Sequence, residues 1–278
     1  MPTGLVSADA QDDFLRTRRH RALSLLARRL RRQPTDADLI LPFEEVVAAL
    51  GHSGERHLGV QPIPLDSIVG TVDRADDFDR RFRPTSTRVR SRWEGIARAM
   101  RRGEALPPIA VYRIGSLHFV RDGHHRVSVG RALGRGDIDA DVVEVRTRIS
   151  PGTDLRVHDL PLKGHERLFS ERVPLEPGQR ERIRLSDAWH YGDLAEMVEA
   201  WGFRAMQERG VFMDRATTAQ QWFEREYIPV VEMIDEADLR GDRSETEAYL
   251  RVSAERYRLL RTHAWDEEVV ARLRHARP

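Results

Sequence analysis

The sequence contains no cysteine and only one lysine, Lys163, and both shortages exclude functions. Without cysteine the chain has no disulfide, no iron–sulfur cluster, no Cys-ligated zinc and no thiol catalysis. Without a Gly-Lys-Ser/Thr run it has no Walker-type phosphate loop. The basic residues are therefore almost all arginines, whose planar guanidinium groups suit bidentate contacts with phosphate.

Long apolar segments are absent as well. The sequence has no run long enough to span a bilayer, and an arginine-dense stretch soon follows Met1 in place of a signal-peptide pattern. We therefore expect a soluble, cytoplasmic protein with no membrane partner, apart from one open interpretation of the first helix. The formal net charge is only +1, so bulk charge does not indicate nucleic-acid binding, although 33% of the residues are charged. A length of 278 residues mildly favours two domains.

Residues 1–60 are predicted to form a basic helical segment. Apolar residues recur at helical spacing from Asp12 to Arg32, with arginines between them. Three interpretations of this helix stay open: its leucines dock on a core, its arginines face a phosphate backbone or an acidic partner, or it contacts a membrane. A second helix is expected from Pro42 to Leu50, ended by Gly51.

Residues 61–147 are predicted to form a small α+β domain with a mixed sheet. Two short helical patterns and several alternating apolar patterns follow one another here, separated by turn residues. The charged stretch from Asp73 to Arg83 is expected to be a loop. Strands are predicted at 61–69, 109–114, 117–120 and 138–145, and helices from Thr85 or Ser86 to Arg102 and from His125 to Leu133.

Residues 148–278 change character and predict an all-helical C-terminal domain. A stretch containing several prolines is followed by helical patterns only, one of them kinked at Pro229. Ser244 and Glu247 form a capping-box pattern that predicts a helix start, and a last short helix is expected around Val269. The usual alanine-to-glycine spacing of a helix-turn-helix is missing, so site-specific DNA reading is not expected.

The strands predicted at 109–114 and 117–120 are joined at Gly115-Ser116 and are expected to form a hairpin. A glycine-containing signature stands between this hairpin and the helix after it. Gly123 allows a sharp turn, the backbone amides that open the following helix attract anions, and Arg126 can hold a phosphate by a forked pair of hydrogen bonds. Pro107-Pro-Ile-Ala-Val111 followed by Phe119-Val-Arg-Asp-Gly-His-His-Arg126 resembles the ParB N-terminal and sulfiredoxin-like superfamily, also called the ParB-like nuclease domain family. The resemblance covers roughly residues 62–145.

The resemblance implies a sulfiredoxin-like fold and a cradle for nucleotide phosphates. Partition proteins of this superfamily bind CTP, and sulfiredoxin and the free-serine kinases bind ATP with Mg²⁺. His124 stands where sulfiredoxin has its cysteine, which excludes the reductase reaction. Arg126 is the only arginine of the signature, so a triphosphate would be held less strongly than in partition proteins.

The candidate site residues follow from this comparison and from the side-chain chemistry. His124 and His125, beside Asp122, are candidates for acid/base catalysis, because imidazole titrates near neutral pH. The two histidines can both face the pocket, divide into one ligand contact and one structural group, or serve only in capping and packing. Gly123, His124 and Arg126 are predicted to bind phosphate, together with Asp73 and Arg74 after the first strand; no metal site is predicted. A solvated loop with weak ion pairs is the competing interpretation for residues 76–83.

Three functions remain open at this stage. The first is a ParB-like, nucleotide-binding protein that associates with DNA through the Arg16–Arg32 helix. The second is a phosphotransferase or nucleotide hydrolase resembling the free-serine kinases, with Asp122, Asp73 or a histidine as base. The third is a non-enzymatic sensor whose helical half binds a protein partner or a second copy as a homodimer; nuclease activity is less favoured, because no carboxylate cluster for metals is visible.

Overall fold

The protein consists of two compact units, Met1–Lys163 and Gly164–Pro278. The computed structural model describes residues 6–31, 39–73, 76–260, 265, 269 and 272. The predicted boundary at 147 lies before the observed division, because Ile149, Leu155 and Leu160 pack into the core of the first unit. The helix predicted around Val269 falls largely outside the described residues.

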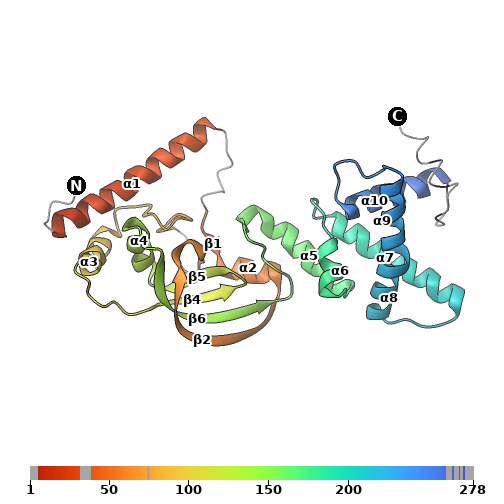
Figure 1. Cartoon of the computed structure of the whole chain (residues 1–278), viewed down its shortest axis with the longest axis horizontal. Coiled ribbons are helices and arrows are strands. Elements are labelled where there is room, and N and C mark those ends of the chain that lie inside the picture. Colours follow the sequence, from red (N-terminus) through yellow and green to blue (C-terminus); the bar gives the residue numbers. More distant parts are fainter. Residues whose placement is uncertain are drawn as a thin grey trace. The chain divides into compact units, whose positions relative to one another are not determined.

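The first unit is built on one mixed six-stranded sheet, as the α+β prediction requires (Figure 1). Its strand order is β1-β3-β5-β4-β6-β2. The central hairpin β4–β5 is antiparallel, whereas β3 pairs with β5 and β6 pairs with β4 in parallel. The strands are β1 (Leu41–Pro42), β2 (His52–Pro64), β3 (Ile68–Thr71), β4 (Ile109–Ile114), β5 (Leu117–Asp122) and β6 (Asp137–Thr147).

Helices cover both faces of this sheet (Figure 1). On one face α2 (Phe43–Leu50) contributes Phe43, Val46 and Leu50 to an apolar core. On the other face α4 (His124–Ala132) packs its Val127 against the sheet. Two further helices, α3 (Arg90–Arg101) and α1 (Val6–Leu30), pack against α4 and each other around the buried indole of Trp93.

Two elements of the first unit differ from the sequence prediction. The strand expected at 61–69 is two strands, because a 3-10 turn, η2 (Leu65–Ser67), interrupts the extended backbone between β2 and β3. β2 begins as early as His52, since its backbone pairs with the whole of β6. The helix expected from Thr85 or Ser86 starts only at Arg90, because the Thr85 hydroxyl donates to the Asp76 carbonyl instead of capping a helix.

The apolar contacts of the basic helix α1 lie in its first half, whereas its second half meets the loop between β3 and α3 through polar contacts of Arg83 and Asp79. Phe14 is fully buried and meets Trp93 edge to face, with 5.5 Å between ring centroids. Asp13 accepts two hydrogen bonds from the Arg101 guanidinium, at 2.6 and 2.9 Å. The interpretation in which the leucines of this helix dock on a core does not hold for its second half, where Leu23, Leu26 and Leu30 are exposed. The reason is that the rest of the unit offers α1 an apolar surface only at α3 and α4.

The second unit is helical over its described residues. Its core groups three aromatic side chains, in which Trp222 donates to the Tyr249 hydroxyl and Tyr227 contacts both rings. The Ser244–Glu247 capping box is confirmed, because each residue's backbone amide donates to the other's side chain. None of the described helices is long and apolar enough to cross a membrane. The helices are α5 (Leu160–Arg172, shared with the first unit), α6 (Pro177–Arg182), α7 (His190–Arg209), α8 (Arg215–Trp222), a π-helical turn (Phe223–Tyr227) just before Pro229, α9 (Ile228–Glu236) and α10 (Glu245–Leu260).

Candidate phosphate-binding site

Gly123 connects β5 to α4 and sets the geometry of the signature loop. Its φ is +101°, a left-handed conformation that side chains with a Cβ rarely adopt. A Cβ at this position would lie 2.4 Å from Cγ2 of Ile109 and 3.1 Å from Nε of Arg126. Glycine is therefore required here both by the backbone turn and by the close approach of β4.

The turn at Gly123 places the uncapped N-terminus of α4 at a small pocket. No side chain caps the N-terminus of α4, whose first intrahelical bond runs from the Val127 amide to the Gly123 carbonyl at 3.0 Å. The first amides of a helix have no partner within it and carry its positive dipole end. The pocket encloses about 80 Å³ and is lined by Arg92, Ile96, Asp122, Gly123, His124, His125 and Arg126.

Arg126 lines this pocket, but its guanidinium is held by neighbouring groups of the protein. It donates to the Pro107 carbonyl, to the Pro108 carbonyl at 2.8 Å and to Asp122 at 2.6 Å. These bonds fasten the start of α4 to the segment that leads into β4. The Arg126 guanidinium was predicted to pair with phosphate, but here it pairs with the Asp122 carboxylate.

The two signature histidines are both buried, and His124 is firmly packed. Its Nε2 lies 2.6 Å from Oγ1 of Thr71, a buried residue of β3 that the sequence did not single out. Its ring also stacks near the rings of Phe78 and Phe82, at 6.3 and 6.2 Å between centroids. His125 meets the Phe78 ring edge to face at 5.4 Å. Packing therefore positions both histidines, and both also line the pocket at the start of α4.

Asp73 and Asp122 are brought to the same end of the sheet. Asp122 ends β5, and Asp73 follows the parallel neighbour β3, in which Thr71 is level with Val120. Both residues are exposed. Arg74 lies outside the described residues. Of the helix arginines, Arg92 lines the pocket, whereas the Arg90 guanidinium pairs with Glu94 at 2.6 Å.

The charged loop between β3 and α3 is folded into the unit, so the solvated-loop interpretation of residues 76–83 is wrong for its central part. Phe78, Asp79, Phe82 and Arg83 are all buried. Asp79 accepts from the backbone amides of Arg81 and Arg83 and from the Arg83 guanidinium, at 2.8 to 3.0 Å. The two phenylalanines enter the core under α4, and their removal from water holds the loop in place.

No group of three or more histidine, aspartate or glutamate side chains that could hold a metal ion occurs within the described part of the chain. No protein-family model matches the sequence, and the comparison with curated proteins found no match. Among solved structures the chain shows a weak similarity to the crystal structure of sulfiredoxin from Arabidopsis thaliana. The TM-score is 0.24 and the identity 17%, over 31% of this chain and 86% of that chain.

Proposed function

We propose that the first unit is a ParB/sulfiredoxin-like domain that binds the phosphate groups of a nucleoside triphosphate, ATP or CTP, at the start of α4. The observation that carries the proposal is the pocket itself, which is lined by an uncapped helix start, a required glycine and Arg92. Helix amides and an arginine together make an anion site. The signature resemblance supports the same chemistry.

The size of the pocket restricts what enters it. About 80 Å³ is far below the roughly 300–1,000 Å³ of pockets that enclose a whole small molecule. A terminal phosphate group fits, and the base and ribose would then lie over the surface outside. Mg²⁺ bound to the triphosphate would be reached by the exposed carboxylate of Asp73, which suits a hard cation.

Calorimetric titration of the full chain with ATP and CTP, each with Mg²⁺, tests this proposal. Arg92→Gln is expected to weaken binding about tenfold or more, since a charge-assisted hydrogen bond contributes roughly 1.5–3 kcal/mol. Arg88→Gln is the matched control, because Arg88 is an exposed arginine just before α3 that does not line the pocket. Equal losses in both variants, or no binding by the wild-type chain, would refute the proposal.

A phosphotransferase or nucleotide hydrolase is the second candidate, favoured by one observation. The side chain of Asp122 lines the pocket and is 70% exposed, so its carboxylate can accept a proton from an acceptor hydroxyl or water beside the bound phosphate. Asp122→Asn is expected to abolish phosphate release or transfer while nucleotide binding persists. Absence of turnover with every nucleotide tested would leave the binding role alone.

Association with DNA remains part of the proposal, through α1. Its second half projects Arg19 and Arg29 to the surface, clear of the packed α1–α3 contact. Phosphate contacts of this kind are independent of base sequence and weaken steeply with salt. Fluorescence anisotropy with duplex DNA should therefore show salt-sensitive binding that is reduced by Arg19→Gln with Arg29→Gln. Undetectable binding at low salt, with and without nucleotide, would remove this part.

A further inference from the structure

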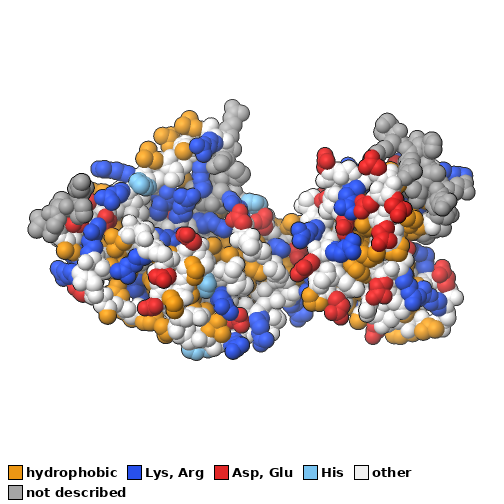
Figure 2. Space-filling view, in the orientation of Figure 1, with side chains coloured by type: hydrophobic (Ala, Val, Ile, Leu, Met, Phe, Trp, Pro, Cys, Tyr) orange, Lys and Arg blue, Asp and Glu red, His pale blue; other side chains and the backbone are white. Residues whose placement is uncertain are grey.

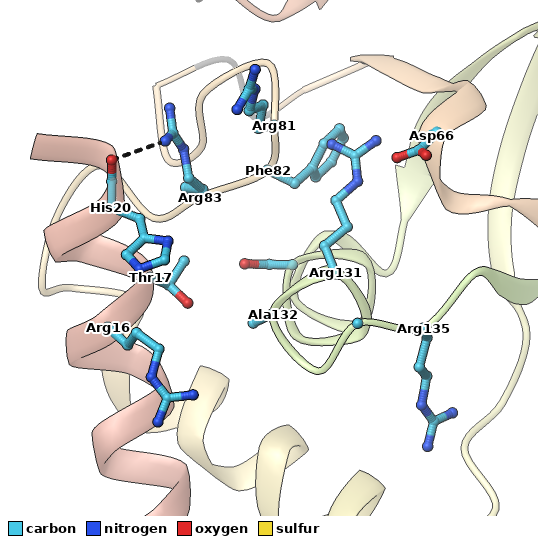
Figure 3. A pocket seen from close by; sticks show the side chains of 12 residues that line it. Arg16, Thr17, His20, Asp66, Arg81, Phe82, Arg83, Arg131, Ala132 and Arg135 are labelled. Atoms are coloured by element: carbon cyan, nitrogen blue, oxygen red, sulfur yellow. Dashed lines mark hydrogen bonds between the residues drawn. The ribbon is translucent and has the colours of Figure 1, made fainter. Parts of the chain in front are cut away.

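A second, larger cavity lies between α1, the folded loop and the middle and end of α4 (Figure 3). It has a volume of about 610 Å³, within the usual range for small-molecule sites. None of its lining residues lines the pocket at the start of α4. Five arginines line it, with Asp66 as the only carboxylate among the lining residues: Arg16, Arg81, Arg83, Arg131 and Arg135.

Ion pairs within the protein neutralise only part of this charge. Arg83 pairs with Asp79 at 2.8 Å, and Arg16 lies 3.7 Å from Asp13. Within the described chain, no carboxylate comes within 4.0 Å of the guanidinium groups of Arg81, Arg131 or Arg135. Three such cations therefore face a single lining carboxylate, and Figure 2 shows the blue arginine side chains gathered below α1 on this side of the unit.

Arg131 is held in place without being neutralised. Its guanidinium donates to the carbonyls of Leu65 and Ile68, at 2.5 and 2.8 Å, and lies over the Phe82 ring at 5.4 Å. Carbonyl oxygens fix the orientation of a guanidinium but leave its formal charge. Burial lowers the pKa of Arg131, because the cation has lost much of its hydration. A bound anion would replace that lost solvation.

We propose that this cavity is a second binding site, for a small anion with adjoining phosphate groups. Arg131 supplies a fixed cation on one wall, and Arg81 and Arg135 are exposed cations at its edges that can close on the ligand (Figure 3). Guanidinium groups bind phosphate oxygens in pairs, and several of them from separate elements suit a diphosphate better than a single phosphate. A ligand here would also tie α1 to the loop and α4.

The site is a half-open hollow and not a flat stripe, which favours a small ligand over a nucleic-acid strand. The arginines line a cavity whose walls also contain Phe82 and Ala132, and Arg131 lies beside an aromatic ring in its interior. A duplex or single strand instead follows an open stripe of cations along a surface. Inorganic pyrophosphate is therefore the appropriate probe, with an oligonucleotide as the competing arm of the experiment.

Calorimetric titration with pyrophosphate at low ionic strength tests this inference in the Arg92→Gln background, in which binding at the start of α4 is weakened. The further change Arg81→Gln with Arg135→Gln is expected to weaken pyrophosphate binding at least tenfold. Both residues are exposed, so the fold should persist, and circular dichroism verifies that it does. Arg56→Gln, an exposed arginine on β2 away from both cavities, is the matched control and should change affinity less than twofold.

Each other result overturns the inference. If the Arg92→Gln chain does not bind pyrophosphate, or if the cavity variant and the Arg56→Gln control behave alike, the cavity is not a phosphate site. If a single-stranded oligonucleotide binds and loses affinity in the cavity variant while pyrophosphate does not bind, the arginines form a nucleic-acid surface instead. Failure at this cavity leaves the proposal for the start of α4 intact, because Arg92 tests that site separately.

Discussion

Replacing Gly123 with alanine tests whether the signature loop has the geometry described above. Two separate effects, backbone strain and overpacking, make the substitution destabilising. A left-handed conformation destabilises an alanine by roughly 1–2 kcal/mol. The new Cβ would also stand 2.4 and 2.8 Å from two atoms of Ile109, in a position where β4 cannot withdraw without losing its place between β5 and β6. Overpacking of this kind costs about 1–3 kcal/mol. The expected loss in the free energy of unfolding is therefore about 2–5 kcal/mol.

Gly134 supplies the matched control at the other end of α4. Its φ is +70°, but a Cβ there would meet nothing within 4 Å. Gly134→Ala should therefore lose only the conformational term, about 1–2 kcal/mol. Denaturant unfolding, monitored by hydrogen exchange in peptides from β4 and β5, measures the stability of the first unit separately from that of the second. A Gly123→Ala variant no less stable than Gly134→Ala would refute the proposed close approach of β4.

Three further predictions follow from buried or paired groups. Burial lowers the pKa of His118 to about 4, so this histidine should not affect the free energy of unfolding above pH 6.5 and should lower it by up to about 3 kcal/mol as the pH drops from 6.5 to 4. His118→Gln should flatten that decline in denaturant titrations, and an unchanged decline would contradict the lowered pKa of His118. Ser128→Ala should destabilise the first unit by about 1–3 kcal/mol, because the buried indole of Trp93 loses its acceptor at 2.8 Å; unchanged urea unfolding would show that another acceptor substitutes. Asp122→Asn should tighten nucleotide binding about fivefold in calorimetry, because the carboxylate repels phosphate and competes for Arg126, which opposes binding by roughly 1 kcal/mol near the surface. Weaker binding would mean that Asp122 acts mainly through Mg²⁺.

The sequence predicted the elements whose signals are local. The hairpin around Gly115-Ser116 and α4 after Gly123 follow from turn residues and apolar spacing within a few positions, and both are confirmed. The first part of β2, residues 52–60, could not be predicted from its own residues, since none of them is buried and the strand exists through backbone pairing with β6. Its partner lies far along the chain, where no local pattern reveals it.

The pocket at the start of α4 was predictable because its residues are close in sequence, whereas the contacts that other elements make with it were not. The signature residues from Asp122 to Arg126 are contiguous, so the pattern places them together at the pocket. The contact of His124 with Thr71 depends on the parallel pairing of β3 and β5. The arginine cavity combines residues from α1, the loop and α4, and only the burial of Phe82 and Asp79 folds the loop toward the other two. The charge pattern of residues 76–83 alone indicated a solvated loop.

Phosphate binding at the start of α4 is tested most directly by hydrogen exchange of the backbone amides there, measured with and without nucleotide. With saturating ATP or CTP and Mg²⁺, slower exchange is predicted in peptides covering the amides of residues 123–127, and Arg92→Gln should abolish the effect while Arg88→Gln retains it. Unchanged exchange in these peptides at saturating nucleotide, or protection only in peptides elsewhere in the chain, would contradict the account.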